Sequence, residues 1–200
     1  MKTVFITGAT AGFGEACADI FAKNGYRLIL NGRRAERLTS LQEKLQKKYN
    51  AACYLLPFDV QDKAAVQTAV SSLPEDWQAI DILVNNAGLA LGRDPFDAAN
   101  IDDWDTMINT NIKGLLYVSK AVVPYMVKRK SGHIINLGSI AAKQTADSVY
   151  EGYQPLVAED VANIIYYCAT LPPHVCINDL VVTPTQQANG IYFQKDGNVL

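Results

Sequence analysis

Three glycines near the amino terminus have the spacing of a loop that binds phosphate. Gly8, Gly12 and Gly14 stand in the stretch TGATAGFGEA, after an apolar run and before a helical pattern. Such glycines permit a tight turn, close approach of the backbone to a pyrophosphate, and close packing of helix on strand. The start of the helix then offers free N–H groups to the anion. The pattern predicts a dinucleotide site at Gly8, Ala9, Thr10, Ala11, Gly12, Phe13 and Gly14.

The residues after the second apolar run indicate which dinucleotide binds. This run ends in LNGRRAERL, so Arg33 and Arg34 stand where sites that prefer NAD carry a carboxylate for the ribose hydroxyls. A guanidinium there can hold a 2'-phosphate through charge-assisted hydrogen bonds. The sequence therefore predicts NADP as the cofactor. The alternative is that both arginines are only exposed side chains before a helix.

Short β-branched runs alternate with longer helical patterns, as is typical of βαβ units and a parallel sheet. We expect strands at 2–7, 26–30, 52–58, 80–85, 133–138 and 179–183. We expect helices from the glycine loop to Gly25 and over 35–49, 62–73, 103–130 and 158–171. The predicted fold class is α/β, a single doubly wound Rossmann domain over 1–200 with a mainly parallel sheet. Residues 139–157 would form a long unstructured connection, which is uncommon and indicates a missing helix-strand unit between 142 and 150.

Composition excludes several classes of protein. The chain has 200 residues, 49% of them apolar, and a net charge of −2, which fits one soluble domain and argues against nucleic acid or an anionic membrane as partner. No apolar run reaches the roughly 20 residues that span a bilayer, and no secretory signal is recognisable, so we expect a cytoplasmic protein. His133 and His174 lack companion ligands, and no metal site is expected. The cysteines show no C-x-x-C pair and are predicted to be reduced and mostly buried: Cys17, Cys53, Cys168 and Cys176.

Further motifs follow the glycine loop in a fixed order, and together they resemble the short-chain dehydrogenase/reductase family. They are DV (59–60), NNAG (85–88), N-x-x-G (111–114) and GS (138–139). The resemblance implies hydride transfer between a nicotinamide cofactor and an alcohol or carbonyl carbon, with the cofactor supplying the redox step. It implies that Asp59 and Val60 contact the adenine, that Asn86, Ala87 and Gly88 bind the cofactor, that Ser139 holds the substrate oxygen, and that Asn111 holds a relay water.

The closer likeness is to NADP-dependent 3-hydroxy acid dehydrogenases, which also oxidise serine or allo-threonine. It rests on Phe13, on DILVNNAGLALG (81–92), on GHIINLGSIA (132–141) and on TLPPHVCINDLVVTPTQQ (170–187). The resemblance implies a small hydroxy acid or its carbonyl product as substrate, including 3-hydroxypropionate and 3-hydroxyisobutyrate. In the family the helix expected at 103–130 packs in a subunit interface, which implies a homotetramer.

The chain departs from the family at its proton donor, a tyrosine whose pKa is lowered by a lysine one helical turn later. No tyrosine here has a lysine four residues on, and Tyr150 leads to Gln154. In one explanation Tyr150 is the catalytic tyrosine and Gln154 has replaced the lysine, which gives an impaired enzyme. In the other, a block of roughly 45 residues is missing after SIAA, judged against the usual length of this fold.

The second explanation has two forms. Either the sequence omits a segment of the protein, or the segment is deleted and the chain is shorter than its relatives. A deletion would leave an apolar face of the long helix exposed, including Leu115, Val118 and Val122. The alternative function is then a catalytically impaired sensor or scaffold that binds NADP(H).

Overall fold

The computed structural model describes residues 1–92, 94–138 and 155–184, and its centre is a parallel sheet in the order β3-β2-β1-β4-β5. Because β1 lies between β2 and β4, the chain winds outward from β1 in both directions, which is the doubly wound Rossmann arrangement. The strands expected at these five places are confirmed, and they are β1 (Thr3–Ile6), β2 (Arg27–Gly32), β3 (Cys53–Pro57), β4 (Ile82–Asn85) and β5 (His133–Asn136).

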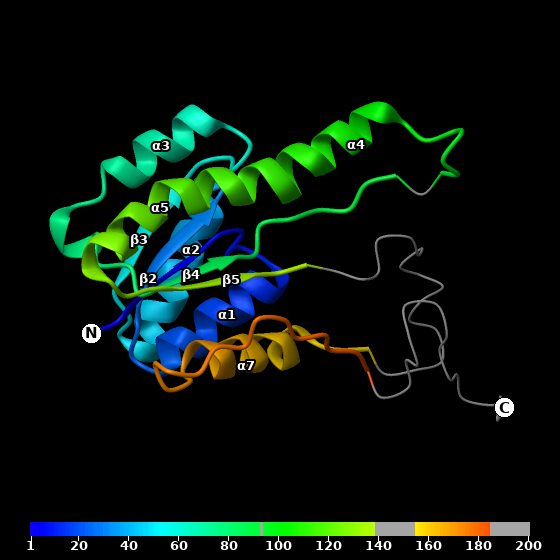
Figure 1. Cartoon of the computed structure of the whole chain (residues 1–200). Helices are drawn as coiled ribbons and strands as arrows, with labels where there is room; N and C mark the ends of the chain where they lie inside the picture. The colour runs from blue at the N-terminus through cyan, green and yellow to red at the C-terminus, as the bar shows by residue number, and fades with distance from the viewer. Residues whose placement is uncertain (93, 139–154, 185–200) are drawn as a thin grey trace, which may run out of the picture.

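Helices cover both faces of the sheet (Figure 1). On one face lie α1 (Gly12–Lys23), α2 (Ala35–Tyr49) and α7 (Ala158–Ala169). On the other lie α3 (Lys63–Ser71), a short 3-10 turn η1 (Glu75–Trp77), and one long helix composed of α4 (Ile101–Met107), η2 (Ile108–Gly114) and α5 (Leu115–Arg129). The helix expected at 103–130 is therefore present, but its middle segment η2 is a π-helix, which the sequence pattern did not predict.

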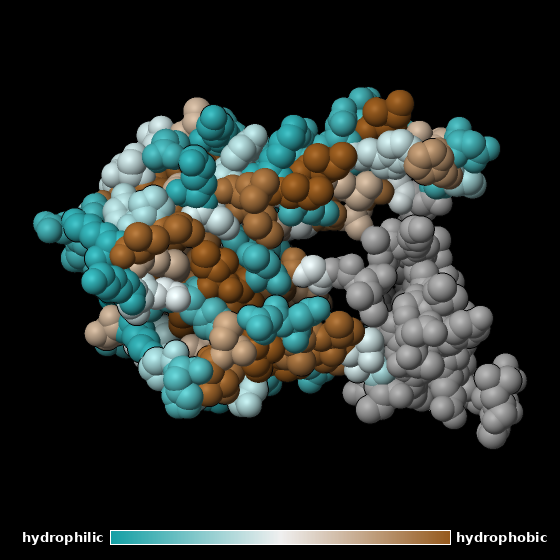
Figure 2. Space-filling view, in the orientation of Figure 1, coloured by the Kyte–Doolittle hydropathy of each residue, from teal (hydrophilic) through white to brown (hydrophobic). Residues whose placement is uncertain are grey.

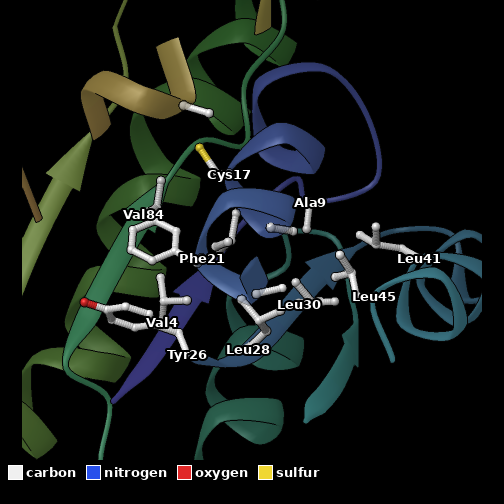
Figure 3. Close-up of a cluster of buried hydrophobic side chains, with 14 of the residues drawn as sticks. Val4, Ala9, Cys17, Phe21, Tyr26, Leu28, Leu30, Leu41, Leu45 and Val84 are labelled. Carbon is white, nitrogen blue, oxygen red and sulfur yellow. The ribbon is translucent and has the colours of Figure 1, made fainter. Parts of the chain in front are cut away.

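The core between α1, α2, α7 and the sheet is closed by aliphatic and aromatic side chains (Figure 3). Leu38, Leu41 and Leu45 are buried on one side of α2, as their helical spacing predicts. Phe21 meets Tyr26 edge to face with the ring centroids 5.1 Å apart. This packing fixes α1 against β1 and thereby fixes the glycine loop between them.

The cysteines differ in exposure. Cys17 is buried in this core, and burial raises its pKa to about 12. Cys53 and Cys168 are half-buried, whereas Cys176 is exposed, so the expectation of burial is wrong for Cys176. It follows the end of α7, where the chain runs along the surface.

Two expectations for the carboxyl-terminal half are wrong. Residues 179–183 form no strand, and Leu180, Val181 and Val182 are exposed. A strand needs a neighbour for its backbone groups, and the described sheet ends at β5. The apolar face expected at Leu115, Val118 and Val122 is also not the exposed one.

Val118 and Val122 are fully buried, because this side of α5 packs in one cluster with Phe5 of β1 and Val66 of α3. Leu115 is half-buried. The exposed apolar residues of the long helix lie on its other side. Figure 2 shows this apolar surface along the helix, and its members are Ile101, Ile108, Ile112, Leu116 and Val127.

Candidate dinucleotide-binding site

The glycine loop joins the carboxyl end of β1 to the start of α1, and its backbone requires glycine. Gly8 and Gly12 have φ values of 63° and 54°, a left-handed conformation that other L-residues rarely adopt. A Cβ at Gly14 would clash with the Gly8 carbonyl oxygen and would lie 2.5 Å from the Asn86 side-chain nitrogen. The glycine pattern therefore produces the tight turn and the close helix approach that its spacing predicts.

The first turn of α1 has donors to offer a ligand. Its N-cap residue, Ala11, is extended and makes no side-chain capping bond, since alanine has no polar group. The N–H groups of the first turn and the positive end of the helix dipole are therefore available to an anion. The residues present thus fit the diphosphate of a dinucleotide.

The fourth strand holds this loop in place. The Asn86 side-chain Nδ2 donates to the carbonyl oxygens of Thr7 at 2.9 Å and Gly8 at 3.1 Å. In return, Thr7 Oγ1 accepts from the backbone N–H groups of Asn86 at 3.0 Å and Ala87 at 2.9 Å. Thr7 was not among the predicted site residues, and its only sequence signal is that it directly precedes Gly8.

Arg33, predicted to hold the 2'-phosphate, and Asp59, expected to contact the adenine, lie beside each other after the ends of β2 and β3. Their closest atoms, Nη1 and Oδ2, are 3.8 Å apart, and the Arg33 side chain is 67% exposed. Asp59 is oriented by accepting the N–H of Gln61 at 3.0 Å. Arg34 follows as the extended N-cap of α2. The Arg33 guanidinium and the uncapped start of α2 thus lie two residues apart in the chain, a combination suited to a phosphate.

Asn111 lies in η2 and contacts the loop after β4. Its Nδ2 donates to the Leu89 carbonyl oxygen at 2.7 Å, and its Oδ1 accepts the Leu89 N–H at 2.9 Å. A Cβ on Gly88 would lie 3.4 Å from that Oδ1. Single π turns inside helices are frequent at functional sites, and this one turns Asn111 toward the NNAG loop. The structure therefore brings two predicted motifs together.

Val60 meets the same helix one turn later. It is buried, and a Cβ on Gly114 would lie 2.7 Å from its Cγ2 atom. The glycine of N-x-x-G therefore allows the long helix to approach the end of β3 closely. The structure therefore brings the DV and N-x-x-G motifs into contact.

Several predicted features lie outside the described residues: Ser139, Tyr150, Gln154 and the break expected between 142 and 150. The structure places the chain up to Gly138, and the Leu137 N–H donates to the Asn85 carbonyl oxygen at 3.0 Å. Within the described ranges, no His, Cys, Asp and Glu side chains gather into a group that could hold a metal ion. The same part of the chain contains no helix long and apolar enough to cross a membrane.

Comparison with known proteins agrees with this geometry. Residues 2–152 match the model of the short chain dehydrogenase family. The NADP-dependent 3-hydroxy acid dehydrogenase of Salmonella typhi is 36% identical, over 92% of this chain and 96% of that protein. The serine 3-dehydrogenase of Agrobacterium fabrum is 34% identical, over 93% and 95%. The chain belongs to the short-chain dehydrogenase family.

Solved structures show the same likeness. The crystal structure of serine dehydrogenase from Escherichia coli matches with a TM-score of 0.82 and 39% identity, over 94% of this chain and all of that one. The closed form of a serine dehydrogenase complexed with NADP+ matches with a TM-score of 0.85 and 36% identity, over 94% and 96%.

The sequence alignments also bear on the missing unit. The match to the Salmonella typhi protein extends over 241 residues, which is longer than the 200 residues of this chain. The relative therefore carries positions that have no counterpart here. This agrees with a block that is absent from the sequence, whereas replacement of a single lysine by Gln154 would not shorten the chain.

Proposed function

We propose that the chain is an NADP-dependent oxidoreductase that transfers a hydride between NADP(H) and the hydroxyl or carbonyl carbon of small 3-hydroxy acids. Candidate substrates are 3-hydroxypropionate, 3-hydroxyisobutyrate, serine and allo-threonine. The observation that carries the proposal is the carboxyl end of the parallel sheet, where the glycine loop follows β1, Arg33 follows β2, and the loop after β4 bonds to Asn111. The names of the relatives, 3-hydroxy acid dehydrogenase and serine 3-dehydrogenase, support the substrate class.

In this proposal each loop at the carboxyl end of the sheet binds one part of the cofactor. The loop from Gly8 to Gly14 binds the diphosphate with its backbone N–H groups. Arg33 and Arg34 hold the 2'-phosphate, and Asp59 and Val60 contact the adenine. Asn86, Ala87 and Gly88 complete the site toward the nicotinamide. NADP, when bound, supplies the acceptor or donor of the hydride.

The chain supplies orientation and proton handling. Ser139 hydrogen-bonds the substrate oxygen, and Asn111 holds a water. The Asn111 side chain bonds to Leu89 through both Nδ2 and Oδ1, and each of these atoms has capacity for one further hydrogen bond to that water. The side chain then serves to fix the loop after β4 against η2.

A second candidate is a sensor or scaffold that binds NADP(H) without turnover. One observation favours it: no tyrosine in the 200 residues is followed by a lysine at the fourth position. Without an adjacent ammonium, a tyrosine keeps its ordinary pKa, near 10, and is a weak general base at neutral pH. Binding would survive this loss, since no predicted cofactor contact comes from that pair.

We further propose that residues 1–200 form one domain and that four copies associate. The exposed apolar stripe on the long helix supports association, because an apolar surface of this kind marks an interaction site. Sedimentation velocity tests it: a tetramer is expected, and a monomer at micromolar concentration would contradict it.

Binding and turnover must be measured separately to test the function. Calorimetric titration with NADP+ and NADPH measures binding, and NADPH formation with each of the four hydroxy acids measures turnover. Binding with turnover supports the oxidoreductase. Binding without turnover on any of them supports the scaffold, and absence of binding contradicts both.

A further inference from the structure

Asn31 is a buried polar residue at the carboxyl end of β2, and its side-chain nitrogen binds β3 and the residue after it. It is 1% exposed, and its Nδ2 donates to the carbonyl oxygens of Leu56 and Phe58, each at 3.0 Å. An asparagine amide has two N–H donors, so both are satisfied. A hydrophobic residue would be the ordinary occupant of a strand buried on both faces, so these bonds call for a reason.

The two bonds hold the strands together at the last pair of their ladder, Gly32 of β2 and Pro57 of β3. Leu28 donates its N–H to the Ala52 carbonyl oxygen, and bonding residues alternate along a strand, so the nitrogen of Pro57 faces the open side of β3, the outermost strand. The proline therefore removes no donor from the β2–β3 ladder. The Asn31 amide adds two side-chain bonds where that ladder ends, on either side of the proline.

Asn31 also contacts the glycine loop through its backbone. Its carbonyl oxygen accepts the N–H of Ala9 at 2.8 Å. Since Asn86 ties β4 to the same loop, the ends of four neighbouring strands are joined laterally in the order of the sheet. Asn31 joins the end of β3 to the glycine loop, on the side where the adenosine is proposed to bind.

The groups on either side of this link are those assigned above to the adenosine phosphate and the adenine. Arg33 follows Asn31 by two residues, and Asp59 directly follows Phe58. The 3.8 Å separation of the Arg33 and Asp59 side chains therefore depends on how closely the ends of β2 and β3 are held.

We propose that Asn31 is a positioning residue that sets the spacing of Arg33 and Asp59 and thereby the affinity for adenosine bearing a 2'-phosphate. This inference rests on the proposed function, because it assumes that NADP binds at this edge. Asn31 acts through Arg33 and Asp59 and needs no contact of its own with the ligand.

The test uses the full chain and 2',5'-ADP, the part of NADP that this corner would bind. Asn31→Leu removes both amide bonds and keeps a side chain of similar size. The matched control is Gln42→Leu, because the Gln42 Nε2 donates to the Cys53 carbonyl oxygen at 2.9 Å, a bond of the same kind at the opposite end of β3. Kd values from calorimetry are compared at a temperature at which circular dichroism shows that both variants are folded.

Both variants are expected to melt at a lower temperature than the wild type. Only Asn31→Leu is expected to raise the Kd for 2',5'-ADP, by about tenfold, which corresponds to about 1.4 kcal/mol. If Asn31→Leu does not fold, Asn31→Thr, which keeps one O–H donor, should weaken binding by a smaller factor.

Two results overturn the inference while leaving the proposed function intact. One is a variant at Asn31 that binds 2',5'-ADP as the wild type does, and the other is an equal loss in Gln42→Leu. A wild-type chain that binds neither NADP nor 2',5'-ADP overturns the proposed function and this inference together, so the two failures are distinguishable.

Discussion

The side-chain nitrogen of Asn86 donates a hydrogen bond to the Gly8 carbonyl oxygen at 3.1 Å, in the space directly beside Gly14. A Cβ on residue 14 would clash with this carbonyl oxygen and would lie 2.5 Å from this nitrogen. Glycine at position 14 is therefore required for the close packing of the β1–α1 turn, the start of α1 and the end of β4.

Gly14→Ala should therefore both destabilise the fold and impair binding. The new methyl group must displace backbone at Gly8, which cannot move without breaking the Asn86 bonds. Overpacking of this kind costs about 1 to 3 kcal/mol, so we expect a lower urea midpoint and a Kd for NADP raised at least tenfold.

Gly132→Ala is the matched control for this variant. Its Cβ would lie 2.5 Å from Met126, but there the obstacle is a flexible side chain remote from the glycine loop. We expect a smaller loss of stability and an unchanged Kd. Equal effects of the two variants on NADP binding would show that the loop does not form the site.

Arg33→Asp should move cofactor preference from NADP toward NAD. The change removes an exposed guanidinium, 3.8 Å from Asp59, that would bind the 2'-phosphate, and adds a carboxylate that repels it. The expected loss for NADP is on the order of one charge-assisted bond, about 1.5 to 3 kcal/mol. Arg37→Ala, another exposed arginine just inside α2, should leave the ratio of Kd values unchanged, and an unchanged ratio in Arg33→Asp would exclude the role given to Arg33.

Because of Asp19, part of the free energy of unfolding should depend on pH in the acid range. Burial alone would raise its pKa, but hydrogen bonds from Tyr49 at 2.8 Å and Lys48 at 3.0 Å, with the nearby lysine charges, lower it overall. A lowered pKa in the folded state stabilises the fold above the unfolded-state value, near 3.9, and the stabilisation is lost as pH falls through the folded-state value.

The measurement is urea unfolding of the wild type and Asp19→Asn from neutral pH down to pH 3. The wild type should be the more stable at neutral pH, and the difference should shrink in the acid range. A difference independent of pH would contradict the role of the Asp19 charge. Glu43→Gln, a surface change on the helix that carries Lys48, controls for the loss of a carboxylate.

The cysteines should react in order of their exposure. Cys176 is exposed, whereas burial raises the pKa of Cys53 to about 11 and that of Cys17 to about 12. The thiolate is the reactive form, so iodoacetamide at pH 8 should modify Cys176 first and Cys17 only on unfolding. Peptide mass mapping over time checks the order, and early modification of Cys17 would contradict its place in the core.

The parts of the site that could be predicted are those encoded by neighbouring residues. Gly8, Gly12 and Gly14 lie within one turn and need only the strand before them and the helix after them. The bond between Thr7 and Asn86 joins residues 79 positions apart, and neither residue alone indicates it. The bond between Asn111 and Leu89 likewise joins two separate segments, 22 positions apart.

At 179–183 the sequence predicts a strand that the structure does not contain. Its residues have high β propensity, but propensity does not supply a neighbour, and in the described sheet none lies beyond β5. The face of the long helix that a deletion was expected to expose, at Leu115, Val118 and Val122, is not the exposed one for a related reason. Packing against the sheet and α3 decides which apolar positions are buried, and the residues of the helix alone do not show it.

The central claim is hydride transfer to NADP, and one experiment tests it directly. The purified chain is mixed with NADP+ and 3-hydroxypropionate carrying deuterium on the carbinol carbon, and the nicotinamide product is analysed by mass spectrometry. The account predicts deuterium in NADPH, and its loss in Ser139→Ala. A chain that binds NADP+ by calorimetry but yields no deuterated NADPH, with this substrate or with deuterated serine, would contradict it.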